Sequence, residues 1–115
     1  MPLSVFDGHE NGFQELVLPE LLKQGIAPLA MKTLGGDAQA VKDGLVTSEE
    51  ALRYGLSLPI ATLISGINTL EWLEKNARVA ASFKPFSREE MDTLLELAKQ
   101  GIAQLTEMQR AALSQ

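Results

Sequence analysis

The chain of 115 residues contains no cysteine. This absence excludes disulfides, thiolate-held zinc or iron–sulfur centres and a thiol nucleophile. A single histidine, His9, excludes a histidine-rich metal site. No apolar run approaches the ~20 residues that a membrane-spanning helix needs, and the first residues lack the basic-then-apolar order of a signal peptide. We therefore expect a cytoplasmic protein with no metal and no membrane partner.

Basic residues are scarce as well. Lys and Arg total 10 against 15 Asp and Glu, so the formal net charge is -5. A nucleic-acid partner is therefore not expected, because such a partner needs excess positive charge. Apolar residues make up 45% and charged residues 22%, which is typical of a globular protein. This length predicts one domain over residues 1–115.

Three short apolar runs, at residues 3–6, 26–31 and 60–65, predict strands. The second and third are almost continuously apolar, which is typical of strands buried on both faces of a parallel sheet. Pro28 cannot donate to a sheet ladder, so it indicates an edge, an early position or a bulge.

After each of the first two runs, apolar residues recur at helical spacing. Residues 13–24 predict a helix that is kinked or broken at Pro19 and ended by Gly25. Thr47 and Glu50 form a capping-box pattern that opens the next helix. The residues expected to be buried in that helix are Ala51, Leu52, Tyr54 and Leu56.

A further helix begins with Asn68 or Thr69 as its N-cap. Its expected apolar stripe consists of Leu70, Leu73, Ala77, Ala80 and Ala81. Trp72, Val79 and Phe83 also lie at helical spacing, so a simple packing role for Trp72 stays open.

A last capping box, Ser87 to Glu90, opens the helical segment at residues 87–115. Gly101 predicts one helix with a break or two helices in series, because glycine weakens a helix interior. The segment either packs back on its own sheet or overhangs as a partner contact. Its apolar face comprises Met91, Leu94, Leu95, Ala98, Ile102 and Leu105.

Alternation of strands and helices predicts right-handed βαβ units and a parallel sheet. The predicted fold class is α/β, with three consecutive βα units on a three-stranded parallel sheet over residues 1–86. A C-terminal helical extension over residues 87–115 completes the domain.

Three stretches resemble the last part of the aldo/keto reductase barrel. They are MPLSVFDGHENGFQELVLPELLKQG, IAPLAMKTLGG and ALRYGLSLPIATLISGINTLEWLEKNARVAASFKPF. The likeness extends over about residues 1–100 in order, and it is greatest to the bacterial branch with an AMKPLGG-type loop. It implies a partial (β/α)8 TIM barrel that holds three of the eight units, whereas a complete barrel has about 250 residues.

Members of that family are NADPH-dependent oxidoreductases that reduce aldehydes and ketones. Their catalytic Tyr, Lys, Asp and His lie on early strands that have no counterpart here, so no catalytic residue is assigned. Tyr54 and Lys32 do not match the family's proton donor and lysine. The resemblance therefore implies a truncated reductase-like protein without catalysis alone, with weak NADP(H) binding as an expectation.

The resemblance also implies two cofactor-binding segments. The loop after the second strand would touch the nicotinamide and pyrophosphate through Met31, Lys32, Thr33, Leu34, Gly35 and Gly36. The third strand end and the following helix would hold the 2′-phosphate and adenine through Ser65, Gly66, Asn68, Trp72, Lys75 and Asn76. Simpler roles stay open, because Gly35 and Gly36 can turn the chain and Asn68 can cap a helix. Neither Asn68 nor Trp72 is basic, so the preference between NADP and NAD stays open.

Three functional hypotheses follow: a reductase remnant, a non-enzymatic interaction or assembly module, and a split reductase completed by a partner chain. We expect a homo-oligomer, most simply a dimer that buries the former barrel interior, because a partial barrel leaves an apolar sheet face and sheet edges bare. The C-terminal helices are an alternative cover for that face. The carbonyl substrate, and whether Met1 is a natural start, stay open.

Overall fold

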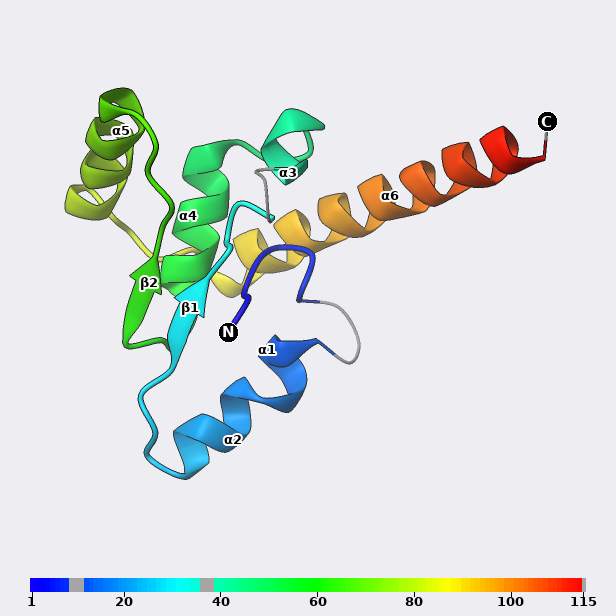
Figure 1. Cartoon of the computed structure of the whole chain (residues 1–115). Coiled ribbons are helices and arrows are strands. Elements are labelled where there is room, and N and C mark those ends of the chain that lie inside the picture. Colours follow the sequence, from blue (N-terminus) through cyan, green and yellow to red (C-terminus); the bar gives the residue numbers. More distant parts are fainter. Residues whose placement is uncertain (9–11, 36–38, 115) are drawn as a thin grey trace.

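The computed structural model describes residues 1–8, 12–35 and 39–114 (Figure 1). In chain order its elements are α1 (Phe13–Leu16), α2 (Leu18–Lys23), β1 (Leu29–Met31), α3 (Gln39–Lys42), α4 (Ser48–Ser57), β2 (Thr62–Ile64), α5 (Leu70–Ala81) and α6 (Arg88–Leu113). The described part is a mixed α/β structure with a small parallel sheet, and this much of the predicted fold class is confirmed.

The sheet consists of β1 and β2, which pair in parallel with Ala30 opposite Leu63. β1 forms only the last three residues of its predicted run, and β2 forms the inner part of its run. Pro28 lies just before β1, and its carbonyl accepts a hydrogen bond from the Ala61 N–H at 2.9 Å. Proline thus takes the early position that its missing donor favours.

The strand predicted at residues 3–6 is wrong. Leu3 N–H donates to the Met31 carbonyl at 3.0 Å, beside an isolated parallel bridge at Pro2. The chain then turns, because the Ser4 N–H and hydroxyl both donate to Asp7 Oδ2, at 2.9 and 2.7 Å. Short polar side chains offer the backbone an alternative to the ladder. The described sheet therefore has two strands and one bridge in place of three strands.

Burial of the strands on both faces is also wrong. Ala30 is fully buried, whereas Leu29 is 48% and Ile64 is 50% exposed. The α6 residues Leu94 and Ala98 belong to the same core cluster as Ala30, so α6 leaves the Leu29 and Ile64 face open. The buried members of that cluster are Leu3, Val5, Leu18, Ala30, Val46, Ala51, Tyr54, Leu58, Leu94 and Ala98.

The predicted helix over residues 13–24 is broken, but at Val17, two residues before Pro19. Pro19 then sits in the first turn of α2, where its missing N–H costs no hydrogen bond. Gly25 has φ +70° and ends α2, as predicted.

The capping box of Thr47 and Glu50 is present, and α4 buries its expected residues apart from Leu56, which is partly exposed. Arg53 on α4 contacts the connector at residues 82–87, which leads from α5 into α6. Its Nε donates to the Lys84 carbonyl at 2.7 Å, and its guanidinium lies 3.9 Å from the centre of the Phe86 ring.

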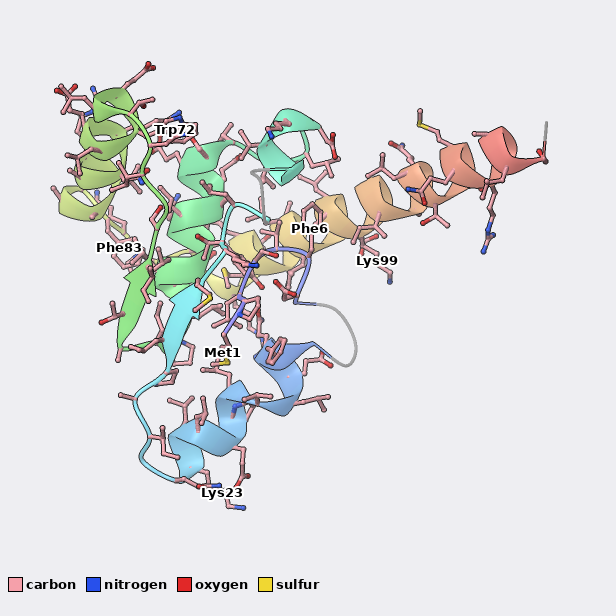
Figure 2. The ribbon with its side chains drawn as sticks, viewed as in Figure 1. Met1, Phe6, Lys23, Trp72, Phe83 and Lys99 are labelled. Carbon is pink, nitrogen blue, oxygen red and sulfur yellow. The ribbon has the colours of Figure 1, made fainter. Side chains whose placement is uncertain are left out.

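Thr69, and not Asn68, caps α5, because its hydroxyl accepts a hydrogen bond from the Trp72 N–H at 3.2 Å. The expected stripe of α5 is wrong: Leu70 is 70% exposed. The packed side carries buried Val79 and half-buried Trp72, and Figure 2 shows Trp72 on the side toward α4. Two apolar stripes share this helix, and α4 covers only one of them.

α6 is one continuous helix, so the break expected at Gly101 is wrong. Gly101 is buried, and a Cβ there would lie 2.4 Å from Leu45 Cδ2. The glycine therefore serves a close approach to residue 45 and does not end the helix. Beyond it, residues 102–114 are all exposed and project from the body (Figure 1). None of the described helices combines the length and apolarity that crossing a membrane requires.

Candidate functional site

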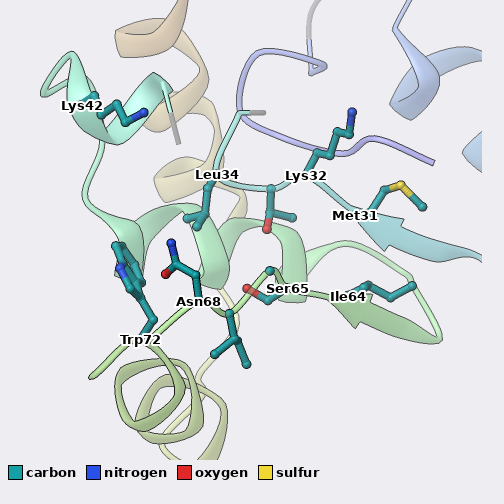
Figure 3. A pocket seen from close by; sticks show the side chains of 11 residues that line it. Met31, Lys32, Leu34, Lys42, Ile64, Ser65, Asn68 and Trp72 are labelled. Atoms are coloured by element: carbon teal, nitrogen blue, oxygen red, sulfur yellow. The ribbon is translucent and has the colours of Figure 1, made fainter. Parts of the chain in front are cut away.

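A pocket of about 840 Å³ opens beyond the carboxyl ends of β1 and β2 (Figure 3). In parallel α/β folds this edge of the sheet is the usual ligand site, because the loops that follow adjacent strands meet there. The lining residues are Met31, Lys32, Thr33, Leu34, Lys42, Ile64, Ser65, Gly66, Ile67, Asn68 and Trp72.

The pocket brings together the two segments that the sequence singled out. Residues 31–34 line it from the end of β1, and residues 65, 66, 68 and 72 line it from the end of β2 and the start of α5. Parallel pairing of Met31 with Ile64 sets the two strand ends side by side. The segments lie about 30 residues apart along the sequence, so the sheet register is what joins them.

Lys32 begins a tight turn after β1. Its φ is +57°, and its carbonyl accepts a hydrogen bond from the Gly35 N–H at 2.8 Å. A lysine rarely adopts this left-handed conformation, and such conformations gather at functional sites. Gly35, with φ +77°, belongs to the turn but does not line the pocket. Gly36 lies outside the described residues.

The two remaining predicted residues, Lys75 and Asn76, do not line the pocket. Lys75 Nζ lies 5.5 Å from the centre of the Trp72 ring. Asn76 Nδ2 donates to Ser65 Oγ at 3.0 Å, so Asn76 touches a lining residue. Its Oδ1 is buried and accepts no hydrogen bond from the described part of the chain. Asn76 therefore contacts the pocket only through Ser65, whose hydroxyl it holds in place.

Lys42 is the main residue that the sequence analysis missed, together with the apolar Ile64 and Ile67. It ends α3, and Figure 3 shows it reaching the pocket from that helix, while Asn68 and Trp72 reach it from the β2–α5 side. No spacing rule places a residue eleven positions beyond the end of β1 next to the following βα unit. Only the path of residues 39–46 brings Lys42 to this edge of the sheet.

The charge of the pocket is positive. Lys32 and Lys42 line it, and no Asp or Glu is among its described lining residues. Because Thr69 caps α5, the Asn68 side chain is left for the pocket. Hydroxyl and amide groups of Thr33, Ser65 and Asn68 add hydrogen-bonding capacity. This combination suits an anionic ligand, for which lysine acts as a point charge.

Tyr54 has a structural role away from the pocket. It is fully buried, and its hydroxyl donates to Gln14 Oε1 at 2.5 Å. Burial raises the pKa of Tyr54 to about 12, which holds its proton firmly at neutral pH. His9 lies outside the described residues. Within the described ranges, no three acidic or histidine side chains gather as a metal site would require.

Neither a protein-family model nor a solved structure matches the chain. The pocket has a volume in the range of small-molecule and cofactor sites. It offers two cations, several polar groups and one aromatic face, the half-buried ring of Trp72. Cations of this kind suit phosphate groups, and an aromatic face of this kind suits a flat ring.

Proposed function

We propose that the chain is a truncated aldo/keto reductase-like protein that binds a phosphate-bearing nicotinamide nucleotide of the NADP(H) class and has no turnover alone. The observation that carries the proposal is the convergence of residues 31–34 with residues 65–68 and Trp72 on one positively charged pocket. The sequence resemblance assigns both segments to the cofactor. None of the pocket residues can take the role of the family's catalytic tyrosine, because Tyr54 is buried elsewhere.

The arrangement of the sheet supports the partial (β/α)8 barrel in this proposal. The N-terminal residues, β1 and β2 lie side by side in chain order, and all of them run parallel. Consecutive units of a (β/α)8 barrel follow this order. The open face with Leu29 and Ile64 is the side that would form the barrel interior, since α4 packs on the other side with Ala30.

The phosphates and one base of the nucleotide have counterparts among the pocket residues. Lys32 and Lys42 supply positive charge for phosphates, and the Trp72 ring offers a stacking surface for a base. Binding is weak in this proposal, because the pocket is open on the side where further barrel strands would stand, and a half-enclosed ligand gains little burial.

Titration with NADPH, followed by fluorescence of Trp72, tests the proposal. We expect a saturable change below millimolar cofactor, since Trp72 is the only tryptophan. Lys42→Ala should weaken binding by about tenfold, which corresponds to one lost charge-assisted contact. Lys23→Ala, on the exposed end of α2, is the matched control and should bind as the parent does. No saturable change up to millimolar NADPH would contradict the proposal.

Repeating the titration with NADH measures the preference between the two cofactors. If Lys42 meets the 2′-phosphate, then Lys42→Ala should reduce NADPH binding and leave NADH binding unchanged. If Lys42 meets the pyrophosphate, both nucleotides should lose affinity equally. The comparison therefore places Lys42 on one phosphate or the other.

The open sheet face favours a second candidate, a non-enzymatic interaction or assembly module. Leu29 and Ile64 form a half-exposed apolar face on β1 and β2. A second copy could cover it and give the expected homodimer, or a partner chain could supply the missing strands and complete a reductase. Association through this face should be abolished by Leu29→Lys, measured as mass in solution. A mass that is unchanged in Leu29→Lys would show that association does not use this face.

A further inference from the structure

We propose that the projecting part of α6, residues 102–113, is a self-association surface that pairs antiparallel with the same segment of a second copy of the chain. The segment makes up the last three turns of α6. Every residue in it is exposed, and Figure 1 shows it extending away from the other elements. Among its side chains, Met108 is 69% and Leu105 is 39% exposed.

A single apolar stripe runs along the whole of α6. Its members alternate three and four residues apart, and they are Met91, Leu94, Ala98, Gly101, Leu105, Met108 and Ala112. The first part of the stripe packs on the body, since Leu94, Ala98 and Gly101 are buried. The part of the stripe from Leu105 onward is exposed to solvent. Spacing of this kind is typical of a helix that packs lengthwise against another helix.

The charge of the segment favours a second copy as the occupant. Glu107 and Arg110 are its only charged residues, so it is neutral in a chain of net charge -5. The positions that flank the stripe hold Ile102, Gln104, Gln109 and Ala111. Charges at flanking positions normally select or repel partner helices. Two copies of this segment can therefore meet without like charges facing each other, while the acidic residues of the bodies stay apart.

The body fixes the relative direction of the two helices. Up to Gly101 the stripe is covered by the chain's own residues, so a partner helix can lie only along residues 102–113, a length of about 18 Å. In a parallel pair both bodies would lie at the same end of the pair and would compete for the same space. In an antiparallel pair they lie at opposite ends, and Leu105 of one copy lies opposite Met108 of the other.

The segment is also formed before it binds. A free helix of a dozen residues is marginal in water, because its first turn is costly to nucleate. Here the N-terminal half of α6 begins with a capping box at Ser87 and Glu90 and is anchored in the core by Leu94 and Ala98. Association therefore does not need to order the helix, which lowers its entropic cost.

Sedimentation equilibrium of the full chain tests the surface. We expect a dimer at about 100 µM and a monomer for Met108→Lys, because two lysines would then enter the contact. Ala103→Lys adds the same charge on the opposite side of the helix and should stay dimeric. Circular dichroism should show unchanged helix in both variants, since both positions are exposed. A monomeric parent chain, or a Met108→Lys variant that stays dimeric, overturns the proposal.

Leu29→Lys separates this surface from the open sheet face. A dimer that persists in Leu29→Lys and dissociates in Met108→Lys supports the α6 contact, and the reverse pattern overturns it. The result is independent of the nucleotide proposal, because neither variant changes a residue that lines the pocket.

The direction of the helices has its own test, which uses the absence of cysteine from the chain. In the antiparallel pair residue 112 of one copy lies near residue 102 of the other, whereas the two copies of residue 112 are more than about 10 Å apart. A mixture of Ala112→Cys and Ile102→Cys chains should form a mixed disulfide under mild oxidation. Efficient disulfide formation by Ala112→Cys alone would overturn the antiparallel arrangement.

Discussion

Gly55 on α4 faces Thr33 and the β2 residue Leu63 at the pocket end of the sheet. A Cβ at this position would stand 2.4 Å from Thr33 Cγ2 and 2.7 Å from Leu63 Cδ1. Thr33 is buried and lines the pocket, so it cannot move aside freely. The missing side chain therefore sets both the distance between α4 and the sheet and the position of a pocket residue.

Gly55→Ala should lower the free energy of unfolding by about 1–3 kcal/mol, the usual cost of overpacking. Gly66→Ala is the control, because a Cβ there would meet no atom within 4 Å. Its free energy of unfolding should stay within about 0.5 kcal/mol of the parent. Urea denaturation measures both variants. Equal stabilities for the two would show that α4 does not approach the sheet this closely.

Tyr54 predicts a pH dependence of stability. Its pKa is raised from 10.0 to about 12 in the folded chain. The folded state therefore retains the proton that the unfolded state releases, so this contribution is complete below pH 10 and is lost as the pH rises toward 12. The loss should reach about 3 kcal/mol. Tyr54→Phe should lack this fall, and urea denaturation between pH 8 and 11.5 compares the two chains.

The lysines also titrate in that pH range, so the difference between the parent and Tyr54→Phe is the informative quantity. If the two denaturation midpoints fall in parallel as the pH rises, Tyr54 is not responsible.

At the scale of elements, short-range chemistry was the most predictable part of the fold. The caps at Thr47 and Ser87 form as expected, because a hydroxyl and a carboxylate three residues apart satisfy each other's backbone N–H groups. The Ser87 N–H donates to Glu90 at 2.7 Å, and this bond lowers the pKa of the Glu90 carboxyl. Such contacts depend only on neighbours in sequence, so the sequence alone can reveal them.

Features that depend on contacts between residues far apart in the sequence were harder to predict. The α5 helix carries two apolar stripes, and only the position of α4 decides that Val79 is buried while Leu70 is exposed. Gly101 resembles a helix breaker until residue 45 is placed against it. Lys42 reaches the pocket through a path that no local pattern determines. In each case the deciding contact joins residues far apart in the sequence.

Two side chains of α4 hold the connector between α5 and α6: the Ser57 hydroxyl accepts a hydrogen bond from the Phe86 N–H at 2.9 Å, and Arg53 makes further contacts. Arg53 donates to the Lys84 carbonyl and stacks on the Phe86 ring, and its Nη2 lies 3.9 Å from Glu90 Oε1. Arg53→Lys keeps the charge but loses the planar contacts. We expect the free energy of unfolding to fall by about 1 kcal/mol. Arg88→Lys, on the exposed first turn of α6, is the control and should change it little.

Thermal or urea denaturation measures the Arg53 effect. The NADPH titration should be unchanged in Arg53→Lys, since Arg53 is not among the residues that line the pocket. A stability equal to that of Arg88→Lys would show that the connector is held by other contacts.

At the scale of the whole molecule, the sequence predicted the alternation of strands and helices but overestimated the sheet. The run at residues 3–6 forms no strand, and the other two runs are longer than β1 and β2, because part of each apolar run adopts irregular backbone. Leu3 and Val5 are fully buried without belonging to a strand. Apolar character therefore identified the core residues here more reliably than it identified their backbone conformation.

The projecting end of α6 gives the molecule an elongated outline. Its radius of gyration is 15.0 Å and its principal extents are 49 × 37 × 26 Å, whereas a compact chain of this length has a radius of gyration of roughly 13 Å. Friction with the solvent rises with elongation, so even a monomer should tumble slowly and leave a gel-filtration column ahead of a sphere of equal mass. Elution volume alone would thus mimic association, and only a mass-based method such as sedimentation equilibrium or light scattering can count the copies.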